Sequence, residues 1–382
     1  MTQFLGARAA AHFSGAAVGI LTFTLLAEPA RADDPTLALL ALTQTLAINE
    51  TAQTVSTVGR AGLSAAETQL RSIQDRLQAA QSLGMPVLAY ADMQSRVEAA
   101  GPESWYATDL RAVPPPEPVS ALRFATWAQG FGDYERRNIV VGTFDFGRTT
   151  RTGGGLGGVD VTKIGVFSAS DAAVVGILGG YSSGYTRNND GSTGRVEGGS
   201  VGWYSVYVNG GFSINSVSKV DFFDSTSTSA VNFTRFRLDN FNTSTSINYK
   251  FTLGTWWLEP TAGVSGTWAS YDNAAFALGM RNGQQVRVQG GLRIGTSTDW
   301  NGIRIEPTLL GQLYSDVVVH GGTIVTPTAP LVPTLQGKLF ALGNAKLNFD
   351  FGKGVSSYLE AEVRGSDRVF GAAGRAGIRY QF

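Results

Sequence analysis

The 382-residue chain contains no cysteine, so it can form neither disulfide bonds nor thiolate metal sites. Charge is also scarce: 16% of residues are charged, against roughly 25% in an ordinary soluble domain, and the formal net charge is zero. The chain therefore lacks the basic surface that nucleic-acid binding requires. No apolar run reaches the length of about 18 residues that a membrane-spanning helix needs. A membrane protein of this composition would have to cross as a closed β-barrel, the other architecture that satisfies its backbone in lipid.

Residues 1–32 have the pattern of an export signal. Arg8 precedes a largely apolar run from Gly15 to Ala27, and Ala30-Arg31-Ala32 fits an A-x-A cleavage site. A buried helix is the alternative interpretation, but a short apolar run before a triplet of this kind favours a signal peptide. We therefore predict that the chain is exported and that residues 1–32 are removed.

Residues 33–118 are predicted to be a helical N-terminal segment that ends in a proline-rich linker. A capping box at Ser64 and Glu67 opens a helix that runs to Leu83 and would be about 30 Å long. Its apolar stripe is narrow and consists of Leu70, Ile73 and Leu77. A weaker helical pattern covers 87–100, and four prolines between 114 and 118 stiffen the linker. Because the stripe is so narrow, we expect no independent core, and the segment could be a short passenger, a plug or a helix in a barrel lumen.

From about Ser120 onward the apolar period changes from 3.6 to 2 and stays there to the end of the chain. The last residues show it plainly, since Ile378, Tyr380 and Phe382 alternate with Arg379 and Gln381. Twelve such strands can be placed, beginning near residues 121, 155, 171, 194, 210, 239, 255, 285, 301, 335, 354 and 370. Short turns alternate with longer connections, such as 135–153 and 183–195, which is typical of outer-membrane barrels with short periplasmic turns and longer external loops.

The alternative is a soluble β-sandwich or lipocalin-like barrel, whose outer surface is charged. Charge is too sparse here for that, so we predict an all-β transmembrane barrel over residues 119–382, a twelve-stranded antiparallel outer-membrane β-barrel preceded by a short α-helical segment. The apolar face of each strand would meet lipid, and the polar face would line the lumen. Strand parity assigns eight charged side chains to the lumen: Glu259, Arg287, Arg293, Arg304, Glu306, Lys346, Arg375 and Arg379.

The sequence offers little catalytic chemistry. His320 lies near Ser315 and Asp316, a combination that an outer-membrane hydrolase could use, but an ordinary loop histidine is the favoured interpretation. Residues 153–158 fit the pattern G-x-G-x-x-G but lack a following helix, so they do not indicate a nucleotide loop. We therefore predict no catalytic residue, no cofactor and no metal.

Several stretches resemble the C-terminal translocator domain of type V autotransporters. WAQGFGDYERR (Trp127–Arg137) resembles the first barrel strand of that family. GGLGGVDVTKIG, VGILGGYSSGYT and WWLEPTAGVSG, which begin at Gly154, Val175 and Trp256, fall where its second, third and seventh strands would. The terminal AGIRYQF resembles the assembly signal that the outer-membrane barrel-insertion machinery reads. The resemblance assigns that role to Ile378, Tyr380 and Phe382.

This resemblance implies a monomeric twelve-stranded barrel in the outer membrane of a Gram-negative bacterium, with a helix threaded through its lumen and an N-terminal passenger carried to the cell surface. Its implied partners are outer-membrane lipid, the barrel-assembly machinery and periplasmic chaperones. The 88 residues from 33 to 120 leave no room for a long β-helical passenger. The Asn188-Asn189 pair lies outside the segment before the barrel, so we do not expect self-cleavage. We expect translocation or display of a short segment; a small pore with a helical plug is the alternative, and an outer-membrane hydrolase is a remote one.

Overall fold

The computed structural model describes Ile73 and residues 122–141, 144–168, 171–229, 233–277, 280–321 and 335–382. Ile73 and the barrel belong to one compact unit, Thr45–Phe382. The predicted signal peptide, the 87–100 helix and the proline-rich linker lie outside the described residues, as does the predicted 64–83 helix apart from Ile73, which is helical. Within the described ranges, no helix is long and apolar enough to span a membrane.

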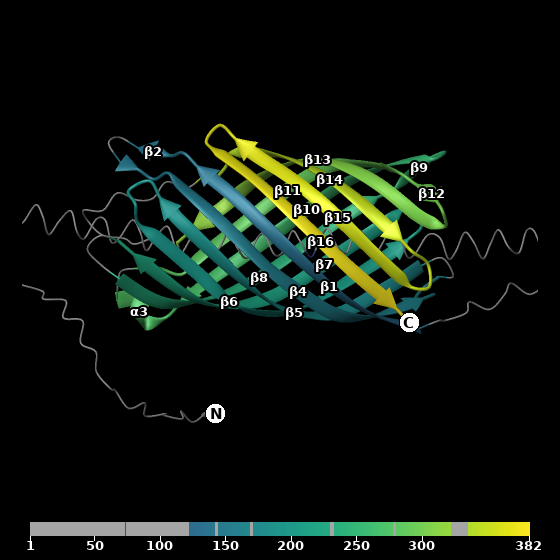
Figure 1. Cartoon of the computed structure of the whole chain (residues 1–382), viewed down its shortest axis with the longest axis horizontal. Helices are drawn as coiled ribbons and strands as arrows, with labels where there is room; N and C mark the ends of the chain where they lie inside the picture. Colours follow the sequence, from purple (N-terminus) through teal and green to yellow (C-terminus); the bar gives the residue numbers. More distant parts are fainter. Residues whose placement is uncertain are drawn as a thin grey trace, which may run out of the picture. The chain divides into compact units, whose positions relative to one another are not determined.

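Twelve long antiparallel strands form one closed sheet (Figure 1). They are β1 (Leu122–Arg137), β4 (Arg148–Ile164), β5 (Asp171–Asn188), β6 (Thr193–Asn209), β7 (Phe212–Thr228), β8 (Phe233–Tyr249), β10 (Trp256–Tyr271), β11 (Gly283–Thr296), β13 (Ile303–His320), β14 (Leu339–Asp350), β15 (Val355–Ser366) and β16 (Val369–Gln381). Each strand pairs with its sequence neighbour, and β1 pairs with β16, which closes the barrel. The predicted twelve-stranded antiparallel barrel is confirmed.

The remaining elements are short. The hairpin of β2 (Val140–Val141) and β3 (Phe144–Asp145) lies in the connection between β1 and β4, and α3 (Asn273–Ala277) lies between β10 and β11. At the opposite end, β9 (Phe251–Leu253) and β12 (Thr298–Trp300) lengthen two tight hairpins. Figure 1 shows α3 and β2 at one end of the barrel, and β9, β12 and the C-terminus at the other. We call these the α3 end and the short-turn end.

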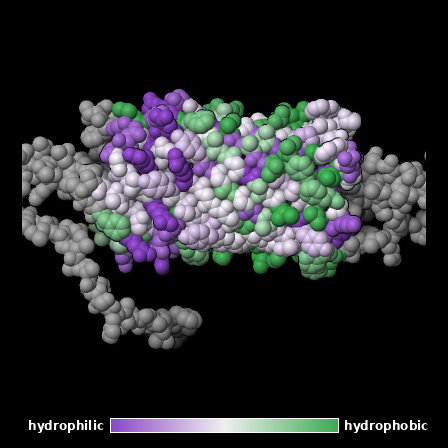
Figure 2. Space-filling view, in the orientation of Figure 1, coloured by the Kyte–Doolittle hydropathy of each residue, from purple (hydrophilic) through white to green (hydrophobic). Residues whose placement is uncertain are grey.

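Burial alternates along each strand because successive side chains point to opposite faces of the sheet. On β1, Trp127 and Phe131 are buried whereas Phe124 and Ala128 are exposed. The exposed face carries large apolar side chains all around the wall, including Val159, Ile177, Trp203, Phe241, Val264, Leu309, Leu359 and Ile378. In Figure 2 hydrophilic residues gather at the α3 end and hydrophobic ones lie toward the short-turn end. A water-soluble protein rarely exposes so large an apolar surface, so the outer face is suited to lipid.

The strands are longer than the alternation predicted, and the connections at the α3 end are shorter. The predicted connection 183–195 shrinks to 189–192, because β5 and β6 extend into it. Likewise β4 begins at Arg148 rather than near 155. About 9–11 residues of a tilted strand cross a bilayer, whereas most of these strands have 16–18. Beyond the lipid both faces of a strand meet water, so the sequence stops alternating while the backbone ladder continues.

Candidate functional site

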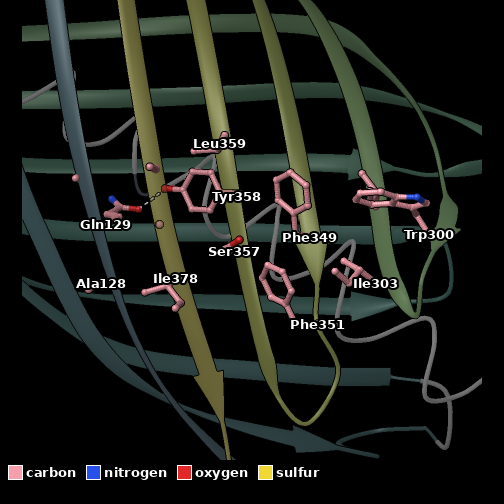
Figure 3. A pocket seen from close by; sticks show the side chains of 14 residues that line it. Ala128, Gln129, Trp300, Ile303, Phe349, Phe351, Ser357, Tyr358, Leu359 and Ile378 are labelled. Atoms are coloured by element: carbon pink, nitrogen blue, oxygen red, sulfur yellow. Dashed lines mark hydrogen bonds between the residues drawn. The ribbon is translucent and has the colours of Figure 1, made fainter.

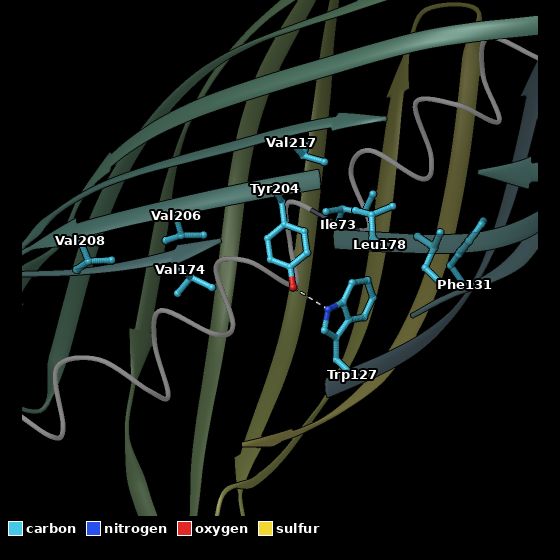
Figure 4. Packing of buried hydrophobic residues seen from close by; sticks show 10 residues of the cluster. Ile73, Trp127, Phe131, Val174, Leu178, Tyr204, Val206, Val208 and Val217 are labelled. Atoms are coloured by element: carbon cyan, nitrogen blue, oxygen red, sulfur yellow. Dashed lines mark hydrogen bonds between the residues drawn. The ribbon is translucent and has the colours of Figure 1, made fainter. Parts of the chain in front are cut away.

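The inward face of the barrel is not uniformly polar, which corrects the expectation that polar side chains line the whole lumen. Buried side chains of β1 and β4–β7 form an apolar patch (Figure 4). Its members from the wall are Trp127, Phe131, Leu156, Val174, Leu178, Tyr204, Val206, Val208 and Val217. Ile73 belongs to the same cluster and has no exposed surface. We call this surface the interior apolar patch. Because water would solvate it poorly, it favours an occupant with an apolar edge.

A polar contact at the edge of this patch links β16 to β4 across β1. The Trp127 Nε1 atom donates to the Tyr204 hydroxyl at 2.8 Å, and that hydroxyl donates to the Asp160 carboxylate at 2.9 Å. The Arg379 guanidinium donates to the other oxygen of Asp160 at 2.8 Å. Asp160 therefore connects strands on both sides of β1 through side chains alone.

Arg364 joins β15 to β1 across the intervening strand β16. Its guanidinium forms a bidentate ion pair with Asp133 at 2.7 and 2.8 Å and contacts Glu135 at 3.4 Å. Gly371 of β16 lies between Arg364 and Glu135 in the register, and a Cβ atom there would lie 2.7 Å from the Arg364 Cζ atom. The glycine therefore leaves room for the crossing. We call Arg364, Asp133 and Glu135 the seam clasp, because they tie the wall together where the first and last strands meet.

A second crossing lies nearer the short-turn end. The Tyr358 hydroxyl donates to the Gln129 Oε1 atom at 2.7 Å (Figure 3), and it passes over Gly377 of β16. A groove of about 660 Å³ opens at this part of the wall. Its large apolar lining residues are Trp300, Ile303, Ile305, Phe349, Phe351, Leu359 and Ile378. Trp300, Phe351, Leu359 and Ile378 are exposed on the outer face, so the groove is suited to the lipid that surrounds the barrel.

The seam clasp continues into a chain of buried charges of alternating sign. Glu362 accepts hydrogen bonds from Arg364 at 3.2 Å and from Arg375 at 2.8 Å. Arg375 also pairs with Glu360, and the Lys346 Nζ atom lies 3.8 Å from a Glu360 oxygen. These side chains are at most 7% exposed. Each of these buried charges has opposite charges beside it. The charge network therefore links strands β1, β14, β15 and β16 and does not present a surface of one sign.

None of the eight charged residues that strand parity assigns to the lumen is exposed, and their lumen-facing role stays a prediction. Glu259, Arg287, Arg293, Glu306, Lys346 and Arg375 are buried, whereas Arg304 and Arg379 are half-buried. Most of them have partners within the wall. Arg293 pairs with Glu259, Arg287 donates to Asp316 at 2.7 Å, and Arg304 donates to the Ser297 hydroxyl at 2.7 Å. The predicted residues thus do not gather at one site but are spread along the inner wall.

Parity alone did not identify the seam clasp. Its members Asp133, Glu135 and Arg364 were missed, and so were Glu360 and Glu362 of the buried charges that continue it. The signal was present in YLEAEVRG (358–365), where charged residues alternate with apolar ones. What the sequence could not show is that β15 lies two strands from β1, a neighbourhood that exists only after the barrel closes.

Apolar side chains from the connections fold inward at the α3 end. Ala275 and Met280, from the connection between β10 and β11, pack with Phe223, Phe236 and Leu238 of the wall. A separate cluster joins Ile139, Phe146 and Leu335, from two other connections, to wall residues that include Tyr314 and Phe340. These two clusters pack against the inward faces of different strands at the α3 end.

The residues of the predicted assembly signal are exposed on the outer face of β16 and directly after its end. Ile378, Tyr380 and Phe382 are 56%, 48% and 69% exposed. The backbone of Phe382 makes two hydrogen bonds to Phe124, at 2.9 and 3.3 Å, and the two rings stack at 6.3 Å. The last residue is thus the final rung of the closing ladder. Its recognition by assembly machinery stays a prediction.

Among the residues that the structure describes, the histidine considered for a hydrolytic site has no catalytic arrangement around it. His320 is exposed at the end of β13, while the Asp316 carboxylate is held by Arg287. Four residues of extended strand separate the two by about 13 Å. The glycines of 153–158 lie within β4 and form part of the wall.

The sequence model of the family described as autotransporter beta-domain matches residues 126–362, more than half of the chain. Among solved structures, the β-domain of the Bordetella autotransporter BrkA aligns with a TM-score of 0.55 and 19% identity, covering 67% of this chain and 98% of that one. The transport unit of the autotransporter AIDA-I from Escherichia coli aligns with a TM-score of 0.52 and 14% identity, covering 73% and 94%. No curated protein sequence gives a significant match. With its closed twelve-stranded wall and this family match, the chain belongs to the autotransporter β-domain family.

Proposed function

We propose that this protein is an outer-membrane translocator that carries its own residues 33–118 toward the cell surface and retains part of them in its lumen. Membership of the autotransporter β-domain family supports translocation in the outer membrane of a Gram-negative bacterium. The finer parts of the proposal are the signal peptide at 1–32, the short cargo at 33–118, assembly as a monomer by the barrel-insertion machinery, and delivery by periplasmic chaperones.

The observation that carries the proposal is the burial of Ile73 in the interior apolar patch. Ile73 is the middle residue of the stripe predicted for helix 64–83, and it has no exposed surface. Leu70 and Leu77 would share its face at helical spacing. An apolar patch inside a barrel and a single apolar stripe on a helix are complementary, since each removes the other from water.

The charges of the inner wall argue for a translocator over the conducting pore. The ionic chain from Arg364 to Lys346 and the pairs Arg293–Glu259 and Arg287–Asp316 join opposite signs within the wall. The wall therefore has no region of a single charge sign, such as a ring of charged side chains that selects a passing ion. The hydrolase is not supported either, because Asp316 is bound to Arg287 and lies away from His320.

Surface display tests the proposal. An epitope placed directly after residue 33 should bind antibody on intact cells, because the segment that leaves the lumen would be outside. The matched measurement is a second epitope in the turn Gly352–Gly354, at the short-turn end, which should bind only after the outer membrane is permeabilised. If the first epitope also requires permeabilisation, residues 33–118 stay in the periplasm and the proposal fails.

The lumen occupant should also limit ion flow. We expect the full chain in a planar bilayer to conduct poorly, and the variant Ile73→Asp to conduct measurably more because a carboxylate would be driven out of the interior apolar patch. Leu77→Asp should act in the same direction, whereas Asp75→Asn, away from the stripe, should leave conductance unchanged. Equal conductance of all four proteins would contradict occupancy of the lumen by this segment.

A further inference from the structure

Three exposed arginines lie together on the outer face of adjacent strands, near the α3 end. They are Arg136 of β1, Arg151 of β4 and Arg187 of β5. Thr149 of β4 is the register partner of both Arg136 and Arg187, and Arg151 is the next outward residue of the same strand. Diagonal neighbours of this kind are about 7–8 Å apart, so one ligand can reach all three guanidinium groups. We call these residues the outer arginine cluster.

Within the described ranges, no carboxylate neutralises the outer arginine cluster. Arg151 and Arg187 take part in no hydrogen bond or ion pair there, and the third member donates to the neutral Asn138 Oδ1 atom at 3.3 Å. Asp145 and Asp190, in the adjacent connections, accept hydrogen bonds from neutral groups. Three positive charges at this spacing repel one another. An anion bound between them would remove that repulsion.

Exposed arginines on the neighbouring strands do have acidic partners. Arg195 of β6 pairs with Glu197 at 2.6 Å, and Arg235 of β8 lies 3.5 Å from Asp224 of β7. The wall is thus able to neutralise an outward arginine within the protein, and it does so next to the cluster. The uncompensated charge of the cluster is therefore a local feature of β1, β4 and β5.

The outer arginine cluster lies at the boundary between lipid and water. On each of its three strands, the arginine is the first charged outward residue at the α3 end, and Figure 2 shows hydrophilic residues gathered at this end. On β4 the outward residues between Arg151 and Lys163 are all uncharged. These 12 steps of strand span about 40 Å, which a tilt of 35–45° reduces to about 30 Å, the thickness of the hydrocarbon core.

Tyrosines mark the same level of the wall. Tyr134 and Tyr185 are the outward residues one step from Arg136 and Arg187 toward the short-turn end, and both are register partners of Arg151. Tyrosine is enriched where lipid headgroups meet the hydrocarbon. The guanidinium groups therefore lie at the depth of the headgroups.

The α3 end is expected to face the cell exterior. The longest connections, 272–282 and 321–338, begin and end there, and outer-membrane barrels have short periplasmic turns and longer external loops. The headgroups at this end belong to the outer leaflet, whose lipid in a Gram-negative bacterium is lipopolysaccharide, a glycolipid with phosphate groups on its lipid-proximal sugars. Arginine forms bidentate hydrogen bonds to phosphate.

We infer that the outer arginine cluster binds the phosphate groups of outer-leaflet lipopolysaccharide. The site is a lipid-docking surface on the outside of the wall. It goes beyond translocation and uses no residue before the barrel.

Titration of the purified full-length protein in detergent with lipopolysaccharide tests the inference. Bound lipid should raise the temperature at which the folded, heat-modifiable band disappears. The variant that combines Arg136→Gln, Arg151→Gln and Arg187→Gln should need roughly 100-fold more lipopolysaccharide for the same rise, because each arginine near an anionic lipid surface contributes about fivefold. Replacing the same three residues with lysine should recover most of the response because the charge remains. If the triple variant does not fold, Arg151→Gln alone should show the fivefold effect.

A second triple variant controls for net charge. Lys163→Gln, Arg195→Gln and Arg235→Gln together remove as many positive charges from the outer face, and this protein should respond as the wild type does. Lipopolysaccharide stripped of its phosphate groups should protect the wild type poorly. If the two triple variants respond alike, or if the dephosphorylated lipid protects fully, the inference is overturned.

Other anions separate the possible sources of phosphate. Inorganic phosphate should give little protection because it has no acyl chains to hold it at the wall, and phosphatidylglycerol should protect less than lipopolysaccharide. Protection by inorganic phosphate alone would indicate a site for a soluble anion, and equal protection by phosphatidylglycerol would remove the assignment to the outer leaflet. Tighter binding of soluble polyphosphate would indicate a surface for a polyanion. Each of these three results would overturn the inference.

Discussion

Replacing Arg364 with methionine should strongly destabilise the barrel. The change leaves Asp133, Glu135 and Glu362 close together without the guanidinium that now contacts all three. Removing one partner of a buried ion pair typically costs about 3–5 kcal/mol, and the remaining carboxylates also repel one another. We expect the heat-modifiable folded form to unfold at a clearly lower temperature, or to fail to accumulate in the outer membrane. A temperature series on a semi-native gel measures the change.

Companion variants distinguish the seam clasp from a general effect of mutation. Gly371→Ala keeps every charge but would place a Cβ atom against the Arg364 guanidinium, so it should act in the same direction as Arg364→Met. Gly374→Ala, on the outer face of the same strand, meets no atom closer than 3.9 Å and should be neutral. Adding Asp133→Asn to Arg364→Met should recover part of the loss. If Arg364→Met unfolds at the wild-type temperature, the clasp does not hold the wall closed.

Deleting Phe382, or replacing it with aspartate, should block insertion into the outer membrane. The deletion removes both backbone hydrogen bonds to Phe124 and the stacked ring, at the point where the two edges of the sheet meet. An unpaired strand edge is unfavourable in lipid because its backbone groups have no partner there. We therefore expect protease-sensitive protein in the periplasm and little heat-modifiable material in the membrane fraction.

Phe351 provides the control for this second prediction. It is an exposed aromatic residue in a hairpin at the same end of the barrel, and it is not part of the terminal strand. Phe351→Asp should reduce yield modestly, while Phe382→Tyr should insert normally because the ring and the backbone bonds remain. Insertion of the Phe382 deletion at wild-type yield would show that the terminal residue is not part of the assembly signal.

The strand pattern could be predicted because the lipid and the interior impose opposite demands on alternate residues. Phe241, Thr243 and Thr245 on one face of β8, and Asn240, Asn242 and Ser244 on the other, leave no second interpretation of that segment. The ends of the strands could not be predicted in the same way. Past the bilayer both faces meet water, so the start of β4 at Arg148 has no signature in the sequence.

The sequence by itself determined that this cysteine-free chain forms a twelve-stranded barrel, because a period of two is a local property that each strand carries alone. The charge network at the closing seam and the interior apolar patch were decided only by the tertiary structure. Arg364 and Asp133 are 231 positions apart in the chain, and Trp127 and Tyr204 are 77 apart. Whether such residues meet depends on the pairing register of every strand that lies between them around the barrel. No local sequence pattern specifies all of these registers together.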